Sequence, residues 1–301
     1  YVDVTGSFLE SNCTMCESGK FSSVVGSTLA RNCIECGVGK YIDVPGSNNT
    51  EDCIDCVAGK YAEGNGSSVE SHCLQCAPGL YSNVVGSNTS TDCIECVPGR
   101  FVVQPGSDEA SDCIECVVGR YVDVPGSNSS SDCIGCAVGQ YSETSGNDAA
   151  DDCIECIAGK YVDVVGSNEA SDCIDCVAGR YVDVAGSAAL SECKDCAAGK
   201  YVAVVGSSAA SDCIDCAAGR YIDVGGSDSD TDCIDCVAGK YVEDTGSALE
   251  SDCIGCAAGK YSTTIGSVSA VSCIDCEAGR YAIDTGSATL EDCIECAVGS
   301  Y

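Results

Sequence analysis

Thirty cysteines offer the most chemistry in this chain, and all of them occur in Cys-x-x-Cys pairs that recur every twenty residues. Such a pair can close a small redox-active ring, supply two ligands to a zinc ion, or form bridges to other pairs. The first two pairs, Cys13 with Cys16 and Cys33 with Cys36, also have the spacing of a zinc ribbon. The local spacing therefore leaves a redox, a metal and a structural chemistry open.

The strict repetition favours the structural chemistry. Fifteen identical redox centres without a helix to support them are not expected. Zinc would use four cysteines per ion and double the period to forty residues, yet no such alternation is visible and one of the fifteen pairs would be left over. We favour a bridge from the second cysteine of each copy to the first cysteine of the next, while interleaved pairings such as Cys13–Cys36 stay open. The favoured bridges include Cys16–Cys33, Cys36–Cys53, Cys56–Cys73, Cys76–Cys93, Cys176–Cys193 and Cys276–Cys293, and they leave Cys13 and Cys296 to pair with copies beyond the chain.

The cysteines belong to a twenty-residue repeat that fits the chain fifteen times without insertion or deletion. Repeat positions are counted from the aromatic residue that opens each copy, as in residues 161–180, YVDVVGSNEASDCIDCVAGR. Gly occupies positions 6 and 19 in all fifteen copies, and Lys or Arg occupies position 20 in twelve. A fixed period predicts one structural unit per copy. We expect one continuous array over residues 1–301, a window of a longer array.

Each copy is expected to form a short β-hairpin. Residues from position 20 to position 4, such as 160–164, are β-branched or aromatic and should be extended. Pro45-Gly46 at positions 5 and 6 has the type II turn arrangement, in which Gly supplies a positive φ. Positions 9–12 are a polar return, and positions 13–17 a second extended piece. The predicted fold class is all-β and disulfide-rich, an elongated rod of fifteen 20-residue single-disulfide hairpin repeats, with the aromatic rings lying over the disulfides.

The composition indicates a cross-linked scaffold. The chain has no Trp, three Phe and one Met in 301 residues. Burial of so little apolar surface cannot offset a backbone entropy of about 1–2 kcal/mol per residue. A bridge that closes a loop of about 18 residues contributes roughly 3 kcal/mol, and this much cysteine points to an oxidising location, extracellular or at the cell surface.

The formal net charge is −33, which makes nucleic acid and anionic membrane surfaces unexpected partners. No segment approaches the length of a transmembrane helix, so no membrane insertion is expected. The acids recur at positions 3, 12 and 15, for example Asp163, Asp172 and Asp175. A solvated face is the favoured interpretation, and an acidic coat that collects Ca²⁺ is the alternative.

The repeat CxxCxxG(K/R)(Y/F)xxxxGSxxxxxCxxC resembles the ephrin-receptor-like cysteine-rich repeat, a relative of the EGF-like and tumour-necrosis-factor-receptor modules. The resemblance runs through the whole chain and is carried by Cys13, Cys16, Gly19, Phe21, Gly26, Cys33 and their equivalents. It implies an extracellular disulfide module of secreted or surface-exposed rods and stalks. The unbroken period of twenty residues, with two cysteines per copy, departs from receptors that mix module types.

Five N-x-S/T sequons are candidates for N-linked glycans. Asn48, Asn88 and Asn128 all occupy position 8, just past the turn, where a bulky sugar could stand clear of the chain. The other two are Asn65 and Asn12, the second with Cys13 inside its sequon. Ser and Thr at positions 7 and 9–11 offer further opportunity for O-linked sugar.

No catalytic constellation is visible, so the chain is not expected to be an enzyme and no cofactor is expected. The only histidine, His72, stands at position 12, where a surface substitution is the simplest interpretation. We expect an extracellular structural glycoprotein that self-associates into a filament, such as a surface fibre, flagellar hair or sheath. The alternatives are an adhesin or receptor stalk and a cation-binding acidic coat. Two strands per copy at about 4.8 Å each would give an array on the order of 150 Å long.

Overall fold

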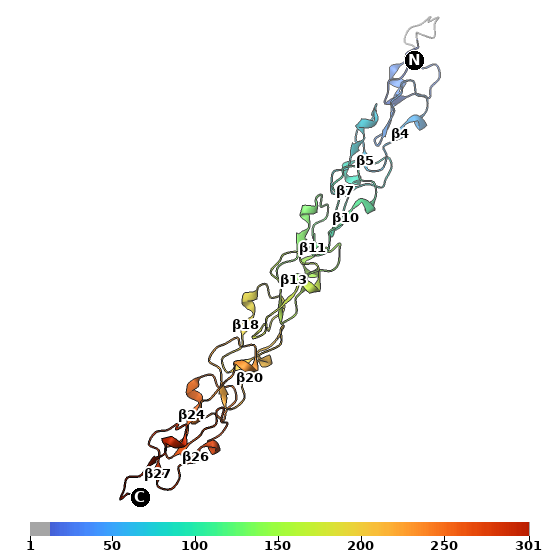
Figure 1. The fold of residues 1–301 in the computed structure, drawn as a ribbon. Helices are drawn as coiled ribbons and strands as arrows, with labels where there is room; N and C mark the ends of the chain where they lie inside the picture. Colours follow the sequence, from blue (N-terminus) through green and yellow to red (C-terminus); the bar gives the residue numbers. More distant parts are fainter. Residues whose placement is uncertain (1–12, 301) are drawn as a thin grey trace. The chain divides into compact units, whose positions relative to one another are not determined.

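The computed structural model describes residues 13–300 and divides into two compact units (Figure 1). Unit 1 comprises Tyr1–Cys136 and Ser142–Cys153, and unit 2 comprises Ala137–Tyr141 and Ile154–Tyr301. The same hairpin recurs in both units, each of which is taken by itself. The single continuous array over residues 1–301 stays a prediction.

Each hairpin is built from two antiparallel strands of two residues, at positions 20 and 1 and at positions 14 and 15. The strand pairs are β1 (Lys20–Phe21) with β2 (Ile34–Glu35), β3 (Lys40–Tyr41) with β4 (Ile54–Asp55), β5 (Lys60–Tyr61) with β6 (Leu74–Gln75), β7 (Leu80–Tyr81) with β8 (Ile94–Glu95), β9 (Arg100–Phe101) with β10 (Ile114–Glu115), β11 (Arg120–Tyr121) with β12 (Ile134–Gly135), β13 (Gln140–Tyr141) with β14 (Ile154–Glu155), β15 (Lys160–Tyr161) with β16 (Ile174–Asp175), β17 (Arg180–Tyr181) with β18 (Lys194–Asp195), β19 (Lys200–Tyr201) with β20 (Ile214–Asp215), β21 (Arg220–Tyr221) with β22 (Ile234–Asp235), β23 (Lys240–Tyr241) with β24 (Ile254–Gly255), β25 (Lys260–Tyr261) with β26 (Ile274–Asp275), and β27 (Arg280–Tyr281) with β28 (Ile294–Glu295).

The first strand is shorter than predicted because position 2 bonds to other hairpins. A hairpin is named here by the second cysteines of two successive copies, so hairpin 196–216 runs from Cys196 to Cys216. In this hairpin the N–H of Val202 donates to the carbonyl of Ser227, in the next hairpin, at 3.1 Å. The carbonyl of Val202 accepts from the N–H of Gly179, in the preceding hairpin, at 2.8 Å. The backbone at position 2 therefore ties each hairpin to the one before it and the one after it.

The polar return contains a single 3-10 turn at positions 10–12, where the sequence predicted no helix. The turns are η2 (Ala30–Asn32), η3 (Thr50–Asp52), η4 (Glu70–His72), η5 (Ser90–Asp92), η6 (Ala110–Asp112), η7 (Ser130–Asp132), η8 (Ala150–Asp152), η9 (Ala170–Asp172), η10 (Leu190–Glu192), η11 (Ala210–Asp212), η12 (Asp230–Asp232), η13 (Glu250–Asp252), η14 (Ala270–Ser272) and η15 (Leu290–Asp292). Over residues 13–300 there is no α-helix.

Two glycines bring alternate hairpins into contact. Gly199, at position 19, has a φ of +86°, and a Cβ added there would collide with the carbonyl oxygen of Gly246 in hairpin 236–256, two hairpins further on. Gly246, at position 6, has a φ of +73° and donates its N–H to the carbonyl of Cys216 at 2.9 Å. Only glycine combines this backbone conformation with so close an approach. The two invariant glycines are therefore the two sides of one contact.

This contact arranges the hairpins of each unit in two rows. The tip of a hairpin lies against the hairpin two before it, so Gly246 also faces the side chain of Asp215 in hairpin 196–216. In unit 1 the coiled ribbons of η3, η5 and η7 lie on one side of the array and those of η4 and η6 on the other (Figure 1). The sequence period is twenty residues, whereas hairpins on the same side recur every forty.

The core consists of small clusters, each built around a single disulfide. Position 2 is the innermost non-cysteine side chain, with Ile42, Val122 and Ile222 at 0–1% exposure. Full burial of such a side chain contributes about 1.5–3 kcal/mol, comparable with the bridge beside it. The predicted fold class, an all-β, disulfide-rich array of single-disulfide hairpin repeats, is confirmed.

Candidate functional site

The centre of each hairpin is a disulfide covered by an aromatic ring. In unit 2 the bridge between Cys176 and Cys193 joins residues 17 apart, with Cα atoms 5.8 Å from each other. Tyr161 and Val182 complete the buried cluster around this bridge. The expectation that the aromatic at position 1 lies over a disulfide is confirmed here and in the equivalent clusters, where Phe21 and Tyr41 are half-buried.

Fourteen disulfides join the second cysteine of one copy to the first cysteine of the next. The structure therefore brings together the pairs Cys16–Cys33, Cys36–Cys53, Cys56–Cys73, Cys76–Cys93, Cys176–Cys193 and Cys276–Cys293. Within residues 13–300 the free thiols are those of Cys13 and Cys296. The Cys-x-x-Cys motif is the joint between successive hairpins, because its two sulfurs belong to two different bridges.

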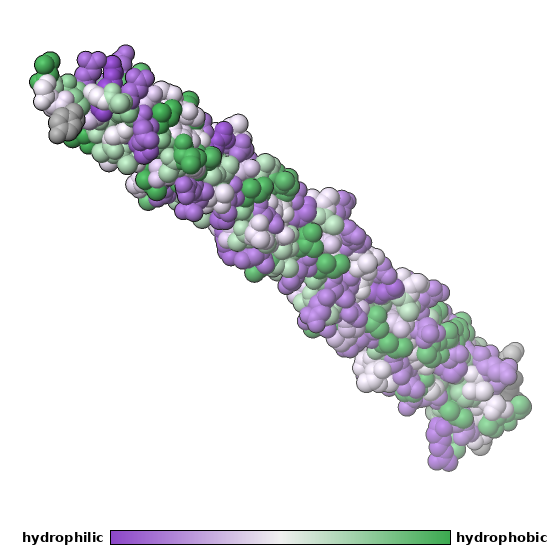
Figure 2. Space-filling model, turned by 90° about the horizontal axis from the view of Figure 1, so that it is seen from below, coloured by the Kyte–Doolittle hydropathy of each residue, from purple (hydrophilic) through white to green (hydrophobic). Residues whose placement is uncertain are grey.

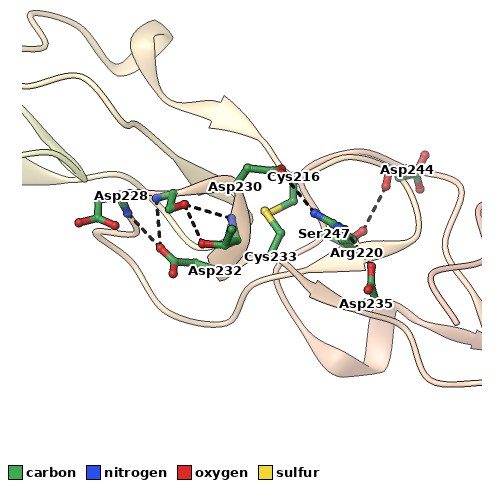
Figure 3. The surroundings of a disulfide bond; sticks show 11 residues. Cys216, Arg220, Asp228, Asp230, Asp232, Cys233, Asp235, Asp244 and Ser247 are labelled. Atoms are coloured by element: carbon green, nitrogen blue, oxygen red, sulfur yellow. Dashed lines mark hydrogen bonds and ion pairs between the residues drawn. A yellow bond between two sulfur atoms is a disulfide. The ribbon is translucent and has the colours of Figure 1, made fainter.

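Cations at position 20 lie opposite acids at position 15 across most of the strand pairs. Lys200 and Asp215 are 2.6 Å apart, and Lys40 and Asp55 are 2.7 Å apart. Figure 3 shows the pair in hairpin 216–236, where the Arg220 Nε lies 2.8 Å from Asp235 and its Nη1 3.2 Å from Asp230. The hydrogen bond and charge of Asp235, followed by the charge and hydrogen bond of Asp230, raise the pKa of Arg220 above its ordinary value.

These ion pairs explain why acids recur at position 15. Where position 15 holds no acid, the cation finds another partner. Arg120, opposite Gly135, donates to the carbonyl of Cys133 at 2.8 Å. Lys60 pairs with Glu70 at position 10 because its cross-strand neighbour is Gln75. Lys240 pairs with Glu250 because its neighbour is Gly255. Exposed pairs of this kind contribute roughly 0–1 kcal/mol each, so they set the register of the strands more than their stability.

The acid at position 12 caps the 3-10 turn. Oδ2 of Asp172 accepts from the N–H of Asn168 at 2.9 Å and from the N–H of Glu169 at 3.1 Å. His72 holds the same position in η4, and its Nδ1 accepts from the N–H of Ser68 at 3.4 Å. The single histidine is exposed and replaces a cap, which assigns it a local structural contact.

Because Asp292 caps η15, we expect the stability of this turn near the end of unit 2 to depend on pH. The backbone N–H of Thr289, then that of Ala288 and the hydroxyl of Thr289, hold the pKa of Asp292 below its ordinary value despite some desolvation. Because the folded pKa is lowered, this stabilisation is present at pH values above the ordinary pKa of about 3.9 and is lost as the pH falls through the lower folded pKa.

An NMR titration of the Asp292 carboxyl should give a midpoint below that of an unfolded peptide. The amide shifts of Ala288 and Thr289 should move with the same midpoint. Thr289→Val removes one of the three donors and should raise the midpoint. A wild-type midpoint equal to that of the peptide would contradict the capping role.

One hairpin replaces the usual Ile at position 14 with Lys194. This lysine donates to Asp183 at position 3, with Nζ 2.7 Å from Oδ1, and lies 5.9 Å from the centroid of the Tyr181 ring. The hydrogen bond raises the pKa of Lys194 and lowers that of Asp183. The substitution shows that positions 1, 3 and 14 share one face of the hairpin.

No group of three or more His, Cys, Asp or Glu residues that could hold a metal ion occurs within residues 13–300. The acids at positions 12 and 15 are engaged by backbone N–H groups and by cations, as in Asp172 and Asp215. A cation-binding acidic coat, with Ca²⁺ as a partner, stays a prediction.

A shallow hollow recurs on the face of the hairpins. It is found at the same repeat positions in three of them, around Val102–Ile114, Val162–Ile174 and Ile283–Ile294. In the second of these it is lined by Val162, Asp163, Val164, Gly166, Ser167, Asn168, Ser171, Asp172 and Ile174. This second hollow joins aliphatic side chains at positions 4 and 14, both about half exposed, to polar groups at positions 3, 8 and 12. In the other two hollows the aliphatic residue lies at position 3, as Val103 and Ile283, and position 4 is polar. Figure 2 shows small apolar patches interspersed with polar surface on one face of the molecule.

The predicted glycosylation sites differ in their surroundings. Asn48, Asn88 and Asn128 are exposed, and their N–H groups donate to the capping Asp at position 12, over 2.9–3.0 Å. Asn65 is exposed at a hairpin tip, but the hydroxyl residue of its sequon, Ser67, is only 7% exposed. Asn12 lies outside the described residues. Glycans at these sequons stay a prediction.

Sequence reasoning missed two buried positions. Position 2 varies from Ser82 to Ile42, and position 7 holds a buried serine such as Ser207. Ser207 pairs with Tyr181 as a parallel bridge, and its hydroxyl donates to the carbonyl of Val204 at 3.0 Å. The recurrence of Ser at position 7 was the available signal, because an exposed turn would tolerate any polar residue there.

Within residues 13–300, none of the helical turns has the length and apolar character that crossing a membrane requires.

Residues 6–53 and 59–113 match the family model for tyrosine-protein kinase ephrin type A/B receptor-like repeats. No curated protein matches the chain. The predicted resemblance is confirmed over these two segments, and the fourteen regular disulfides show that the chain is a tandem cysteine-rich repeat array. Such repeats are extracellular-type structural or ligand-binding modules.

Proposed function

We propose that this array of ephrin-receptor-like repeats is an extracellular structural protein that self-associates into a surface fibre, flagellar hair or sheath. The observation that carries the proposal is the repetition of one set of contacts in hairpin after hairpin. Gly206 donates to Cys176, and Gly246 donates to Cys216, with the same geometry forty residues apart. A structure whose neighbour contacts are identical can extend by adding copies, which is the property that a fibre or stalk needs.

The distribution of buried and charged side chains supports a structural role. The buried groups are mainly disulfides, aliphatics and serines that hold the backbone together, and no charged residue within 13–300 is buried. The net charge of −33 would keep separate chains apart at low salt. Lateral association should therefore strengthen as salt screens the repulsion.

The proposal is tested on the 301-residue chain secreted from a eukaryotic cell. Small-angle scattering should give an extended particle with a length on the order of 150 Å. Sedimentation at increasing salt should show growing assemblies, and reduced, alkylated protein should scatter as a flexible unfolded chain and should no longer assemble. A compact particle, or an extended one that stays monomeric at every salt concentration and protein concentration, would contradict the fibre.

A receptor or adhesin stalk is the second candidate, and the match of residues 6–53 and 59–113 to receptor-like repeats is the observation that favours it. The stalk shares the extended array but needs no self-association. An extended particle that never assembles would favour this alternative.

A further inference from the structure

The hollow of hairpin 156–176 has a lining suited to binding a sugar ring. In hairpin 156–176 the exposed Val164 and Ile174 supply aliphatic walls, while Asp163 and Asp172 supply acceptors at the edge. A pyranose presents apolar C–H groups on its faces and hydroxyl or amide groups around its rim. Asn168 at position 8 lies on the same rim, so a sugar attached at that position starts within reach of the hollow.

The three position-8 sequons occur in hairpins that carry both aliphatic walls. Val44 and Ile54 accompany Asn48, Val84 and Ile94 accompany Asn88, and Val124 and Ile134 accompany Asn128. These six aliphatic side chains are 45–58% exposed, which leaves apolar surface that a first sugar could cover.

The hydroxyl residues of these sequons are accessible. Thr50, Ser90 and Ser130 are exposed at the first residue of η3, η5 and η7. An enzyme that modifies asparagine must reach both the amide and this hydroxyl residue, and neither is enclosed by a neighbouring hairpin.

Asn65 has the opposite setting. Gly66 within its sequon donates to the carbonyl of Cys36 at 2.8 Å, and Ser67 forms a bridge with Tyr41 and donates its hydroxyl to Gly64. The sequon is therefore part of the contact that stacks hairpin 56–76 on its predecessors. Modification there would have to precede or disrupt stacking.

We infer that unit 1 carries N-linked glycans at Asn48, Asn88 and Asn128, that the first sugar of each covers the exposed aliphatic pair at positions 4 and 14 of its own hairpin, and that Asn65 stays bare. The inference rests on the proposed extracellular function. Because η3, η5 and η7 lie on one side of unit 1, the sugars follow one row of hairpins and leave the other row uncovered (Figure 1).

Site occupancy is measured first, by mass spectrometry of intact glycopeptides from the secreted 301-residue chain. Asn48, Asn88 and Asn128 should be occupied, and Asn65 should be occupied several-fold less. Equal occupancy at Asn65 and Asn88 would contradict the inference that the exposed sequons at position 8 are glycosylated in preference to Asn65. A secreted chain with all of its disulfides and no sugar at position 8 would overturn the inference and leave the structural proposal standing, whereas a chain that is not secreted or not bridged would contradict the proposed function itself.

Coverage of the aliphatic side chains by the first sugar is measured by hydroxyl-radical footprinting. Val84 and Ile94 should be labelled several-fold more slowly in the glycosylated protein than in Asn88→Gln, while Val164 and Ile174, in a hairpin without a sequon, should label equally in both. The substitution Ala170→Ser creates an N-x-S sequon at Asn168 and should transfer the protection to Ile174. An occupied Asn88 with no protection of Ile94, or an occupied Asn168 with no protection of Ile174, would contradict this coverage.

Discussion

Gly199→Ala is expected to destabilise unit 2 locally by about 2–5 kcal/mol, whereas Gly279→Ala, at the same repeat position, is expected to cost only about 1–2 kcal/mol. Both glycines have a φ of +86°, so both variants place an L side chain in the left-handed region. They differ in what the new Cβ meets. At Gly199 it collides with the carbonyl oxygen of Gly246, and at Gly279 no atom lies within 4 Å.

The difference between the two variants isolates the contact between alternate hairpins. To admit the methyl group, hairpin 236–256 must withdraw, which also breaks the bond from the N–H of Gly246 to the carbonyl of Cys216. Overpacking of this kind typically costs about 1–3 kcal/mol beyond the backbone strain.

Amide hydrogen exchange is the appropriate measurement, because a repeat array opens segment by segment rather than all at once. In Gly199→Ala the protection of the Gly246 amide, and of its neighbours in hairpin 236–256, should fall. In Gly279→Ala that hairpin should keep the wild-type protection. Equal losses in the two variants would mean that the backbone strain alone matters and that the Gly–Gly approach contributes nothing.

The hairpin was predictable because its determinants are local. Gly46 after Pro45 indicated a type II turn, and the φ of Gly46 is +82°. The recurring cysteines indicated bridges between copies, since that pairing is the one that closes each loop once. A repeat of one aromatic, two glycines and two cysteines thus specifies the closed loop without any long-range contact.

The stacking of alternate hairpins was not predictable, because none of the residues that form the contact follows a forty-residue period. The approach of Gly199 to Gly246 spans 47 residues, yet each glycine by itself reads as an ordinary turn residue. Two glycines that both require a positive φ are compatible with many arrangements of hairpins. The structure selects the one in which the missing Cβ of one glycine makes room for the carbonyl of the other.

The acids were read as one solvated face because they share a charge, although they have separate roles. Asp172 caps a turn, Asp175 pairs with Lys160, and Asp163 borders the hollow. Co-occurrence was the available signal for the ion pairs, since position 20 is basic in most copies in which position 15 is acidic. The cap could not be read from the sequence, because a 3-10 turn of three residues has no periodicity.

Removal of the Cys176–Cys193 bridge by the double substitution Cys176→Ala/Cys193→Ala should cost more than removal of the equivalent bridge by Cys276→Ala/Cys293→Ala. Both bridges join residues 17 apart, so the loop-entropy contribution is the same, roughly 3 kcal/mol. Substituting both partners avoids a free thiol that could pair wrongly with another cysteine.

The two bridges differ in how deeply they are packed. Cys176 is 0% exposed and Tyr161 against it is 9% exposed, whereas Cys276 and Tyr261, at the equivalent places, are only half-buried. The carbonyl of Cys176 also accepts from the N–H of Gly206 in hairpin 196–216. Loss of the first bridge should therefore expose Tyr161 and release the tip of a second hairpin.

Hydrogen exchange and limited proteolysis of the two double variants separate these contributions. In Cys276→Ala/Cys293→Ala only the affected hairpin should lose protection. In Cys176→Ala/Cys193→Ala the loss should spread to hairpin 196–216, with the Gly206 amide as its marker, because the disulfide holds the carbonyl on which that hairpin docks. If the loss stays within hairpin 176–196, each disulfide stabilises its own loop alone, and the continuity of the array must come from the glycine contacts and the position-2 backbone bonds.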